Sequence, residues 1–196
     1  MIKTMATAAV LLASCVVANA NALHLNPAQP GSAANMATFG RTSVPIGHYE
    51  YCQKYQDRCS LQSGDPQVEL SRVLWSKIVE VNDRINRDVK PLTDMQIFGV
   101  EERWEYPDQV GDCEDYALQK RRILSSMGIP LGALLLTVGR DADGGGHAVL
   151  TVVTDLGDFI LDNVEQRVLR WQDAELTYLK RQSSRDPKHW ESLRPG

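Results

Sequence analysis

Three short apolar runs in the C-terminal half of the chain set the strongest limit on its fold. They cover residues 133–138, 147–154 and 158–161, each a suitable length for one strand. The second and third are separated by a tight turn at residues 155–158, which is typical of a β-hairpin. A glycine-rich segment at residues 139–146 separates the first two. We therefore expect these runs to form an antiparallel sheet.

A long helix is expected before the strands. Apolar residues recur at helical spacing at Leu70, Leu74, Ile78, Val81 and Ile85. Asp65-Pro66 predicts the start of this helix, because an N-cap residue followed by proline at the first helical position favours initiation. The helix should end before Pro91, since proline cannot continue it.

A second helix is predicted from Asp112 to about Met127, where Gly128 and Pro130 stop it. The order of elements is then two helices followed by antiparallel strands. This order predicts an α+β fold in which N-terminal helices pack on an antiparallel sheet.

The first 65 residues are expected to contribute little to the core. Residues 1–22 have the pattern of a secretory signal peptide, with one early lysine, an apolar stretch and small residues at the cleavage positions. Residues 23–44 form an expected extended lead-in, and the polar composition continues to residue 65. The domain is predicted over residues 45–196. An export signal predicts a periplasmic protein; the alternative is that Cys15 lies in a lipobox and is lipidated, which would hold the protein on a membrane.

Composition limits the class of function. The chain has 196 residues, enough for one domain with a substantial core. Its apolar content of 43% and charged content of 23% are ordinary for a globular protein. A net charge of -4 and the lack of a basic stripe argue against nucleic acid as a partner.

The four cysteines of the chain can be sorted by position. Cys15 leaves with the predicted signal peptide. Cys52 and Cys59 lie close together in a polar, loop-like stretch, and an oxidising compartment would join them in a disulfide. Cys113 is then left without a partner, which suggests a catalytic thiol. The alternative is a buried cysteine that acts as a small apolar side chain.

Cys113 lies at the start of the second predicted helix. The partial positive charge and free N–H groups there favour a thiolate and can bind an oxyanion. The neighbouring carboxylates of Asp112, Glu114 and Asp115 oppose thiolate formation. A nucleophile at Cys113 would therefore need an imidazolium or a metal ion nearby.

His147 and Asp162 are the predicted partners of Cys113. His147 begins the second strand and Asp162 follows the third, so pairing of these strands would bring the two side chains together. Asp162 could then orient the imidazole while His147 activates Cys113. Each residue also has a structural alternative, because an isolated strand histidine is more often structural and an aspartate after a strand often belongs to a turn.

Three sequence strings together resemble a known family. They are Gly-Asp-Cys-Glu-Asp-Tyr-Ala at 111–117, His-Ala-Val at 147–149 and Leu-Asp-Asn at 161–163. They are similar to the bacterial transglutaminase-like cysteine peptidases, whose best-known members are the LapG-type periplasmic proteases. The resemblance implies a papain-like, transglutaminase-type core.

The resemblance also implies roles for individual residues. Cys113 would be the nucleophile, His147 the base and Asp162 the orienting residue of a Cys-His-Asp triad. Papain-like enzymes use a further oxyanion donor upstream of the nucleophile, and Gln109 and Trp104 are the nearby candidates.

A calcium ion beside the nucleophile is a further implication of the resemblance. In this sequence its ligands would be Asp112 and Glu114, with Asp115 as a third. Carboxylate oxygens suit a hard cation such as Ca²⁺. The alternative is that Asp112 only caps the helix while Glu114 and Asp115 complement its dipole.

LapG-type proteases cut large surface adhesins and so release cells from biofilm, and an inner-membrane cyclic di-GMP receptor restrains them. The resemblance thus implies a protein substrate in the cell envelope and such a receptor as regulator. The glycines at 144–146 depart from the family pattern, which leaves substrate and regulator open. Two other functions share the predicted fold: a transglutaminase-type acyl transferase, and a non-catalytic calcium-dependent binding protein.

Overall fold

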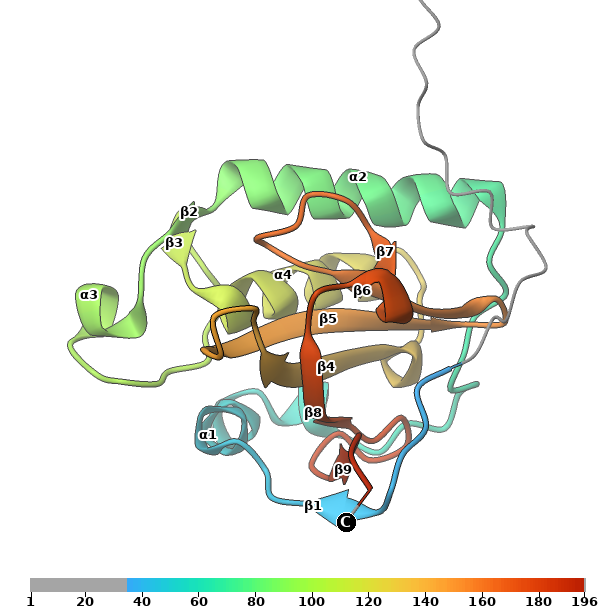
Figure 1. Ribbon diagram of the computed structural model, residues 1–196, viewed down its shortest axis with the longest axis horizontal. Helices are drawn as coiled ribbons and strands as arrows, with labels where there is room; N and C mark the ends of the chain where they lie inside the picture. Colours follow the sequence, from blue (N-terminus) through green and yellow to red (C-terminus); the bar gives the residue numbers. More distant parts are fainter. Residues whose placement is uncertain (1–34, 196) are drawn as a thin grey trace, which may run out of the picture.

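The structure is a computed structural model that describes residues 35–195. The predicted signal peptide, Cys15 and most of the predicted lead-in lie outside the described residues. An antiparallel sheet of seven strands forms the centre of the molecule (Figure 1). Its strands, in spatial order, are β1 (Arg41–Thr42), β9 (Trp190–Ser192), β8 (Thr177–Gln182), β4 (Leu134–Arg140), β5 (Gly146–Thr154), β6 (Gly157–Leu161) and β7 (Leu169–Arg170).

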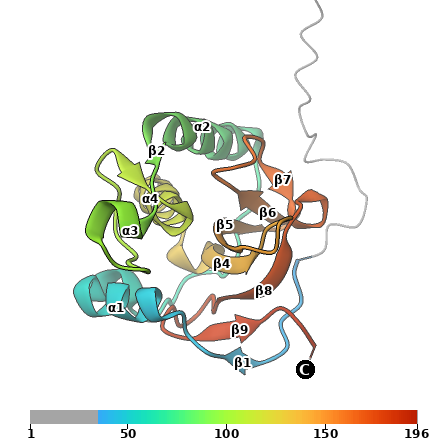
Figure 2. The ribbon, with the colours of Figure 1, turned by 60° about the vertical axis from the view of Figure 1, so that its left-hand side comes forward.

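Helices cover one face of this sheet in two layers. Helix α4 (Cys113–Ser126) packs on β5 and β4, and α2 (Arg72–Asp88) packs on α4 (Figure 2). The remaining elements are α1 (Ile46–Lys54), α3 (Asp94–Phe98), the parallel pair β2 (Lys90–Pro91) and β3 (Val110–Gly111), and the 3₁₀ turns η1 (Gln56–Cys59), η2 (Leu131–Ala133) and η3 (Trp171–Asp173). The predicted α+β fold, with helices packed on an antiparallel sheet, is confirmed.

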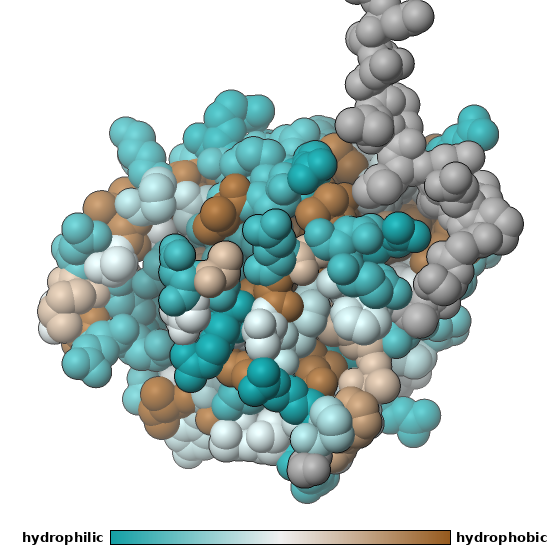
Figure 3. All heavy atoms as spheres, viewed as in Figure 1, coloured by the Kyte–Doolittle hydropathy of each residue, from teal (hydrophilic) through white to brown (hydrophobic). Residues whose placement is uncertain are grey.

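The main core lies between these layers. Ile78 and Val81 of α2 and Leu124 of α4 are completely buried against the central strands. Hydrophilic residues cover most of the face shown in Figure 3, and the apolar residues there form small separate patches. Within residues 35–195, no helix combines the length and apolar character needed to cross a membrane.

The predicted start of the long helix is wrong. Helix α2 begins at Arg72, and the Ser71 hydroxyl caps it by accepting a hydrogen bond from the Leu74 N–H at 3.1 Å. Val68, expected inside the helix, is extended and donates its N–H to the carbonyl of Val153 at 3.1 Å. Backbone pairing with the end of β5 therefore overrides the local Asp65-Pro66 signal. The predicted end before Pro91 is confirmed, since α2 ends at Asp88.

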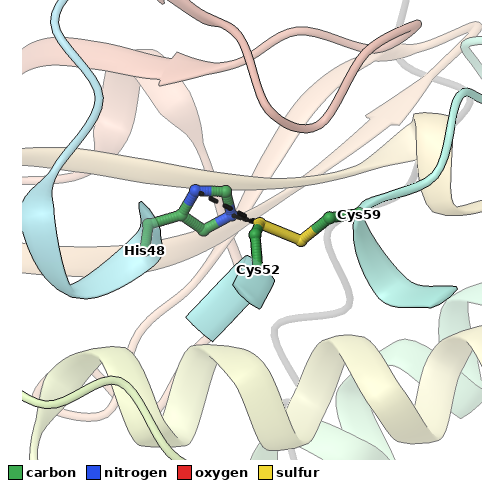
Figure 4. A group of neighbouring side chains, drawn as sticks. All are labelled: His48, Cys52 and Cys59. Atoms are coloured by element: carbon green, nitrogen blue, oxygen red, sulfur yellow. Dashed lines mark hydrogen bonds between the residues drawn. A yellow bond between two sulfur atoms is a disulfide. The ribbon is translucent and has the colours of Figure 1, made fainter. Parts of the chain in front are cut away.

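The segment expected to be poorly structured up to residue 65 is ordered. It contains α1 and η1, and a disulfide joins Cys52 of α1 to Cys59 of η1. The buried face of α1 consists of Gly47, His48, Tyr51 and Cys52. These residues are small, polar or aromatic, so they do not produce the aliphatic periodicity that revealed α2. Figure 4 shows His48 beside the disulfide.

The polar tail after Arg170 supplies two strands that were not predicted. Strand β8 pairs with β4, and β9 joins β8 to β1, which falls inside the predicted lead-in. Trp190 of β9 is completely buried. Gln182, also completely buried, accepts a hydrogen bond from the Leu136 N–H at 3.0 Å. These strands carry polar side chains such as Gln182, which become buried only through long-range contacts. The strands therefore lack the apolar pattern by which a strand is predicted from sequence.

Candidate active site

Cys113 is the first residue of α4 and is half-buried. Within residues 35–195 it is the one cysteine that is not in a disulfide. Gly111 allows the chain to turn into the helix here, because a Cβ at Gly111 would lie 2.8 Å from the Asp115 side chain. The glycine before the nucleophile therefore lets the first turn of α4 pack closely against β3.

The β5–β6 hairpin brings His147 and Asp162 together. Leu150 pairs with Leu161, so that His147 near the start of β5 faces Asp162 just beyond β6. His147 Nε2 lies 2.8 Å from Asp162 Oδ1, and His147 is 8% exposed. The strand pairing thus gives the proximity that the sequence predicted.

The same strand contacts the thiol. The backbone N–H of Ala148, the residue after His147, donates to Cys113 Sγ at 3.3 Å. Asp162 occupies Nε2 of His147, which leaves Nδ1 as the ring nitrogen available to the thiol. Across residues 35–195 the structure records no hydrogen bond between thiol and imidazole themselves; the Sγ hydrogen bonds to Glu114 Oε2 at 3.2 Å. Cys113, His147 and Asp162 nevertheless form one contiguous group.

Lys120, which is buried, and Asn86, which is partly buried, both contact Asp162. Its backbone carbonyl accepts hydrogen bonds from Lys120 Nζ at 2.9 Å and Asn86 Nδ2 at 2.8 Å. Burial lowers the pKa of Lys120 to about 7, although Asp162 acts in the opposite direction. Burial would raise the pKa of Asp162, but its hydrogen bond with His147 and the charge of His147 outweigh burial and lower it. The sequence analysis did not identify Lys120 or Asn86.

A group of carboxylates lies directly beside the nucleophile. Asp94 of α3, Asp112 and Glu114 each present an oxygen within 4.8 Å of the others. The Asp112 side chain does not cap α4; its Oδ2 accepts a hydrogen bond from the Asp94 N–H at 3.1 Å. One buried oxygen of Asp94 and one of Asp112, Oδ1 in each, lack a hydrogen-bond partner within the described residues. Buried, unpartnered carboxylate oxygens at this spacing fit a hard cation such as Ca²⁺.

The electrostatics of this group are unfavourable without a cation. Burial, followed by the charge of Asp112, raises the pKa of Glu114 to about 9. Burial also raises the pKa of Asp94. Burial and then Glu114 raise the pKa of the Cys113 thiol well above its usual value, while the Ala148 N–H acts in the opposite direction. The carboxylates and burial therefore outweigh the thiolate stabilisation expected at a helix start.

Asp115, the expected third ligand, lies outside this group. Its Oδ1 accepts a hydrogen bond from the Glu105 N–H at 2.9 Å, and burial raises its pKa to about 8. Asp94 joins Asp112 and Glu114 instead. The sequence did not indicate Asp94, because it is brought to Asp112 by the parallel pairing of β2 with β3.

Of the two upstream candidates for an oxyanion donor, Trp104 is bonded to another side chain, and Gln109 lies at the surface. Trp104 is buried, and its Nε1–H donates to Glu102 Oε1 at 2.6 Å. Gln109 is exposed, and its carbonyl accepts a hydrogen bond from the Lys90 N–H at 2.9 Å. The free backbone N–H groups of the first turn of α4 remain as candidate donors.

Comparison with known proteins shows the family of this chain. Residues 38–196 match the sequence model of a family described as bacterial transglutaminase-like cysteine proteinase. The chain belongs to this family. A search of curated proteins gives no significant match. Family membership supports a transglutaminase-like cysteine peptidase.

Solved structures of LapG from Legionella pneumophila are similar to this chain. Calcium-bound LapG is 21% identical over 78% of this chain and 84% of LapG, with a TM-score of 0.53. EGTA-treated LapG is 22% identical over 74% of this chain and 83% of LapG, with a TM-score of 0.48. The similarity to the calcium-bound protein shows a shared fold.

Proposed function

We propose that this protein is an exported cysteine endopeptidase with Cys113, His147 and Asp162 as its triad. The observation that carries the proposal is the 2.8 Å contact between His147 and Asp162, one residue from the amide that binds Cys113 Sγ at 3.3 Å. The family match over residues 38–196 supports the same activity.

The arrangement supports acyl transfer through a thioester. His147 Nδ1 accepts the thiol proton as Cys113 Sγ attacks the peptide carbonyl. Backbone N–H groups at the start of α4 would stabilise the tetrahedral oxyanion. The imidazolium returns its proton to the leaving amine as the C–N bond breaks, and His147 then activates the water that hydrolyses the thioester. Asp162 keeps the ring oriented with Nδ1 toward the thiol.

We propose further that Asp94, Asp112 and Glu114 hold a calcium ion. Their unpartnered buried oxygens support this, as does the existence of calcium-bound LapG. A bound divalent cation would offset the carboxylate charges beside the thiol. The calcium dependence of activity follows from this proposal, because Glu114 both belongs to the group and hydrogen bonds to Cys113.

The proposed substrate is a protein of the cell envelope or surface, such as a biofilm adhesin, and the proposed site of action is the periplasm. An inner-membrane cyclic di-GMP receptor is the corresponding candidate regulator. The family resemblance supports all three.

The test is proteomics of the envelope fraction of cells that produce either wild-type or Cys113→Ala protein, with and without a calcium chelator. We expect new protein termini with the wild type, their loss in Cys113→Ala, and fewer of them with the chelator. Cleavage by Cys113→Ala protein would refute the proposed nucleophile.

A labelled primary amine and a glutamine donor distinguish the rival acyl transferase. Incorporation of the amine at a rate above hydrolysis would identify transfer as the main reaction. A Cys113 thiol that does not react with alkylating reagents at neutral pH would instead support a non-catalytic binding protein.

A further inference from the structure

A cavity of about 410 Å³ opens beside the proposed catalytic histidine. His147 and Asp162 line one end of it. The turn before β5, at Asp141–Asp143, and the segment after η3, at Ala174–Glu175, line other parts. Two of the three proposed triad residues therefore line the cavity.

The lining of this cavity has an apolar part. Ile160 is buried, and Val164, Leu169 and Ala174 add further aliphatic surface. A surface of this kind suits the methylene stem of a long side chain, which binds apolar groups while its polar end reaches outward.

The charged part of the lining is mainly negative. Arg167 is the one lysine or arginine that lines the cavity, and Glu165 already pairs with it through bonds of 3.1 Å and 2.8 Å. Asp141, Asp143 and Glu175 also line it, and no ion pair is recorded for them within residues 35–195. Within residues 35–195 these three carboxylates thus make no recorded ion pair, and the nearby Arg140 donates through Nη1 to the carbonyl of Gly144 at 2.8 Å.

These three carboxylates differ in the hydrogen bonds that they already accept within the fold. Asp141 Oδ1 accepts hydrogen bonds from the N–H groups of Asp143 and Gly145, at 3.0 Å and 2.7 Å, and so holds the turn. No hydrogen bond is recorded for the side chain of Asp143 or Glu175 within the part of the chain that the structure describes. Asp143 and Glu175 are exposed, and both can turn toward a bound cation.

The position of His147 decides which part of a substrate would meet this cavity. The imidazole must protonate the leaving amine, so the peptide segment that departs with that amine runs past His147. The cavity begins at His147 and does not include Cys113 among its lining residues. This position, beside His147 and away from Cys113, is one that the departing segment of a substrate would pass.

We propose that this cavity binds a lysine or arginine side chain of the substrate, located C-terminal to the scissile bond. The aliphatic lining takes the stem, and Asp143 and Glu175 take the cationic group. This inference rests on the proposed peptidase function and adds a substrate class to it.

The first test uses a peptide library prepared by digesting a bacterial proteome, with cleavage sites read by mass spectrometry. We expect lysine and arginine to be enriched C-terminal to the sites cut by wild-type protein. In the double variant Asp143→Asn/Glu175→Gln the enrichment should fall about three- to tenfold, the range of one or two part-exposed ion pairs. Asp143→Lys/Glu175→Lys should favour aspartate and glutamate instead. Asp57→Asn, at a side chain 74% exposed in η1, is the matched control and should behave as wild type.

The outcomes separate this proposal from the peptidase function. Cleavage without lysine or arginine enrichment, or enrichment that survives in both double variants, would overturn the cavity proposal and leave the peptidase intact. A wild-type protein that cuts no peptide in calcium would overturn the proposed function.

In that case, labelling of the Cys113 thiol tests separately whether the cavity attracts a cationic group. Cys113 is labelled with a cationic and an anionic methanethiosulfonate reagent, and mass spectrometry measures the rate at Cys113 alone. In the wild type we expect the cationic reagent to react faster than the anionic one. At low salt, the ratio of the cationic rate to the anionic rate should fall about threefold in Asp143→Asn/Glu175→Gln. An unchanged ratio would contradict a cation-binding cavity at this place.

Discussion

Two clusters in this molecule each bring three potential metal ligands within 4.8 Å of one another, and they differ in how their polar atoms are used. At the first, which we call the His48 cluster, the sulfurs of Cys52 and Cys59 are joined in a disulfide (Figure 4). Trp190 Nε1 lies 3.2 Å from His48 Nδ1, and Gln182 Nε2 lies 2.9 Å from His48 Nε2. Both neighbours are N–H donors, so a neutral imidazole accepts from only one of them. Its other nitrogen carries the proton and has Cys52 Sγ as acceptor, at 3.6 Å from Nε2 or 3.8 Å from Nδ1. The ring of His48 is therefore surrounded by polar partners.

At the second, the carboxylate cluster of Asp94, Asp112 and Glu114, buried oxygens lack partners. In both clusters, the potential ligand atoms lie within 4.8 Å of one another. The comparison teaches that unsatisfied buried polar atoms, and not closeness alone, distinguish a binding site from a structural contact. We therefore expect the His48 cluster to act in stability, and the contrast supports the calcium site proposed for the carboxylate cluster.

The largest effect is expected from a substitution that disrupts the His48 cluster. Trp190→Ala removes a completely buried indole that packs edge-on against His48 and Trp104. We expect it to lower the free energy of unfolding by about 3–5 kcal/mol, the usual cost of a large cavity. Urea unfolding with and without calcium measures this. A variant as stable as the wild type would contradict a structural role for the cluster.

Acid should weaken the same cluster through His48. Burial, followed by the charge of Arg121, lowers the pKa of His48 to about 3. The unfolded chain binds this proton near pH 6.5, so acid favours unfolding throughout the interval between the two pKa values. Between pH 6 and pH 4 this costs about 2–3 kcal/mol at about 1.4 kcal/mol per pH unit.

The His48→Gln variant isolates this term, because glutamine retains hydrogen-bonding atoms and cannot titrate. Between pH 6 and pH 4, the free energy of unfolding of this variant should fall by about 2–3 kcal/mol less than that of the wild type. Equal pH dependence in the two proteins would rule out His48 as the acid-sensitive group.

Loss of the disulfide should have a somewhat smaller effect. Cys52 and Cys59 are separated by 7 positions, and a short closed loop contributes about 2–3 kcal/mol through the unfolded state. We expect Cys52→Ser/Cys59→Ser protein to lose this amount in urea unfolding while Cys113 keeps its reactivity toward alkylation. Loss of Cys113 reactivity in a folded variant would show that the His48 cluster also acts on the active site.

The smallest expected effect sharpens the assignment of the carboxylate cluster. Asp94→Asn removes one proposed ligand charge and should weaken calcium binding at least about tenfold, or about 1.4 kcal/mol. Asp115→Asn is the matched control, since Asp115 accepts its hydrogen bond from the Glu105 N–H and lies outside the cluster. Isothermal titration with CaCl₂ compares the two. A greater loss in Asp115→Asn would restore Asp115 as the ligand in place of Asp94.

Local sequence patterns predicted the part of the fold that carries the proposed triad. The start of α4 at Cys113 and the β5–β6 hairpin depend on neighbours within a few residues, so capping and turn residues reveal them. A two-residue turn fixes the register of a hairpin, and that register places Asp162 beside the start of β5, where its side chain reaches His147. The disulfide between Cys52 and Cys59 was also expected from their short separation.

Other features required contacts between distant segments. Helix α1, strands β8 and β9 and the extended conformation at Val68 gain their stability from partners far along the chain. Lys120 is completely buried and donates to the backbone carbonyl of Asp162, a contact that no local pattern indicates. Periodicity shows which face of a helix is apolar, but it does not show which buried polar groups will find partners.

The sequence by itself determined the nucleophile candidate and its two partners, because a helix start and one hairpin are local structures. The tertiary structure alone decided that Asp94 joins Asp112 and Glu114 while Asp115 does not, since the pairing of β2 with β3 brings α3 to the start of α4. It also decided that polar partners would surround the ring of His48, while one buried oxygen each of Asp94 and Asp112 would lack a hydrogen-bond partner in the described part of the chain. The physical reason is that satisfaction of a buried polar atom depends on every segment packed around it, and most of those segments are distant in sequence.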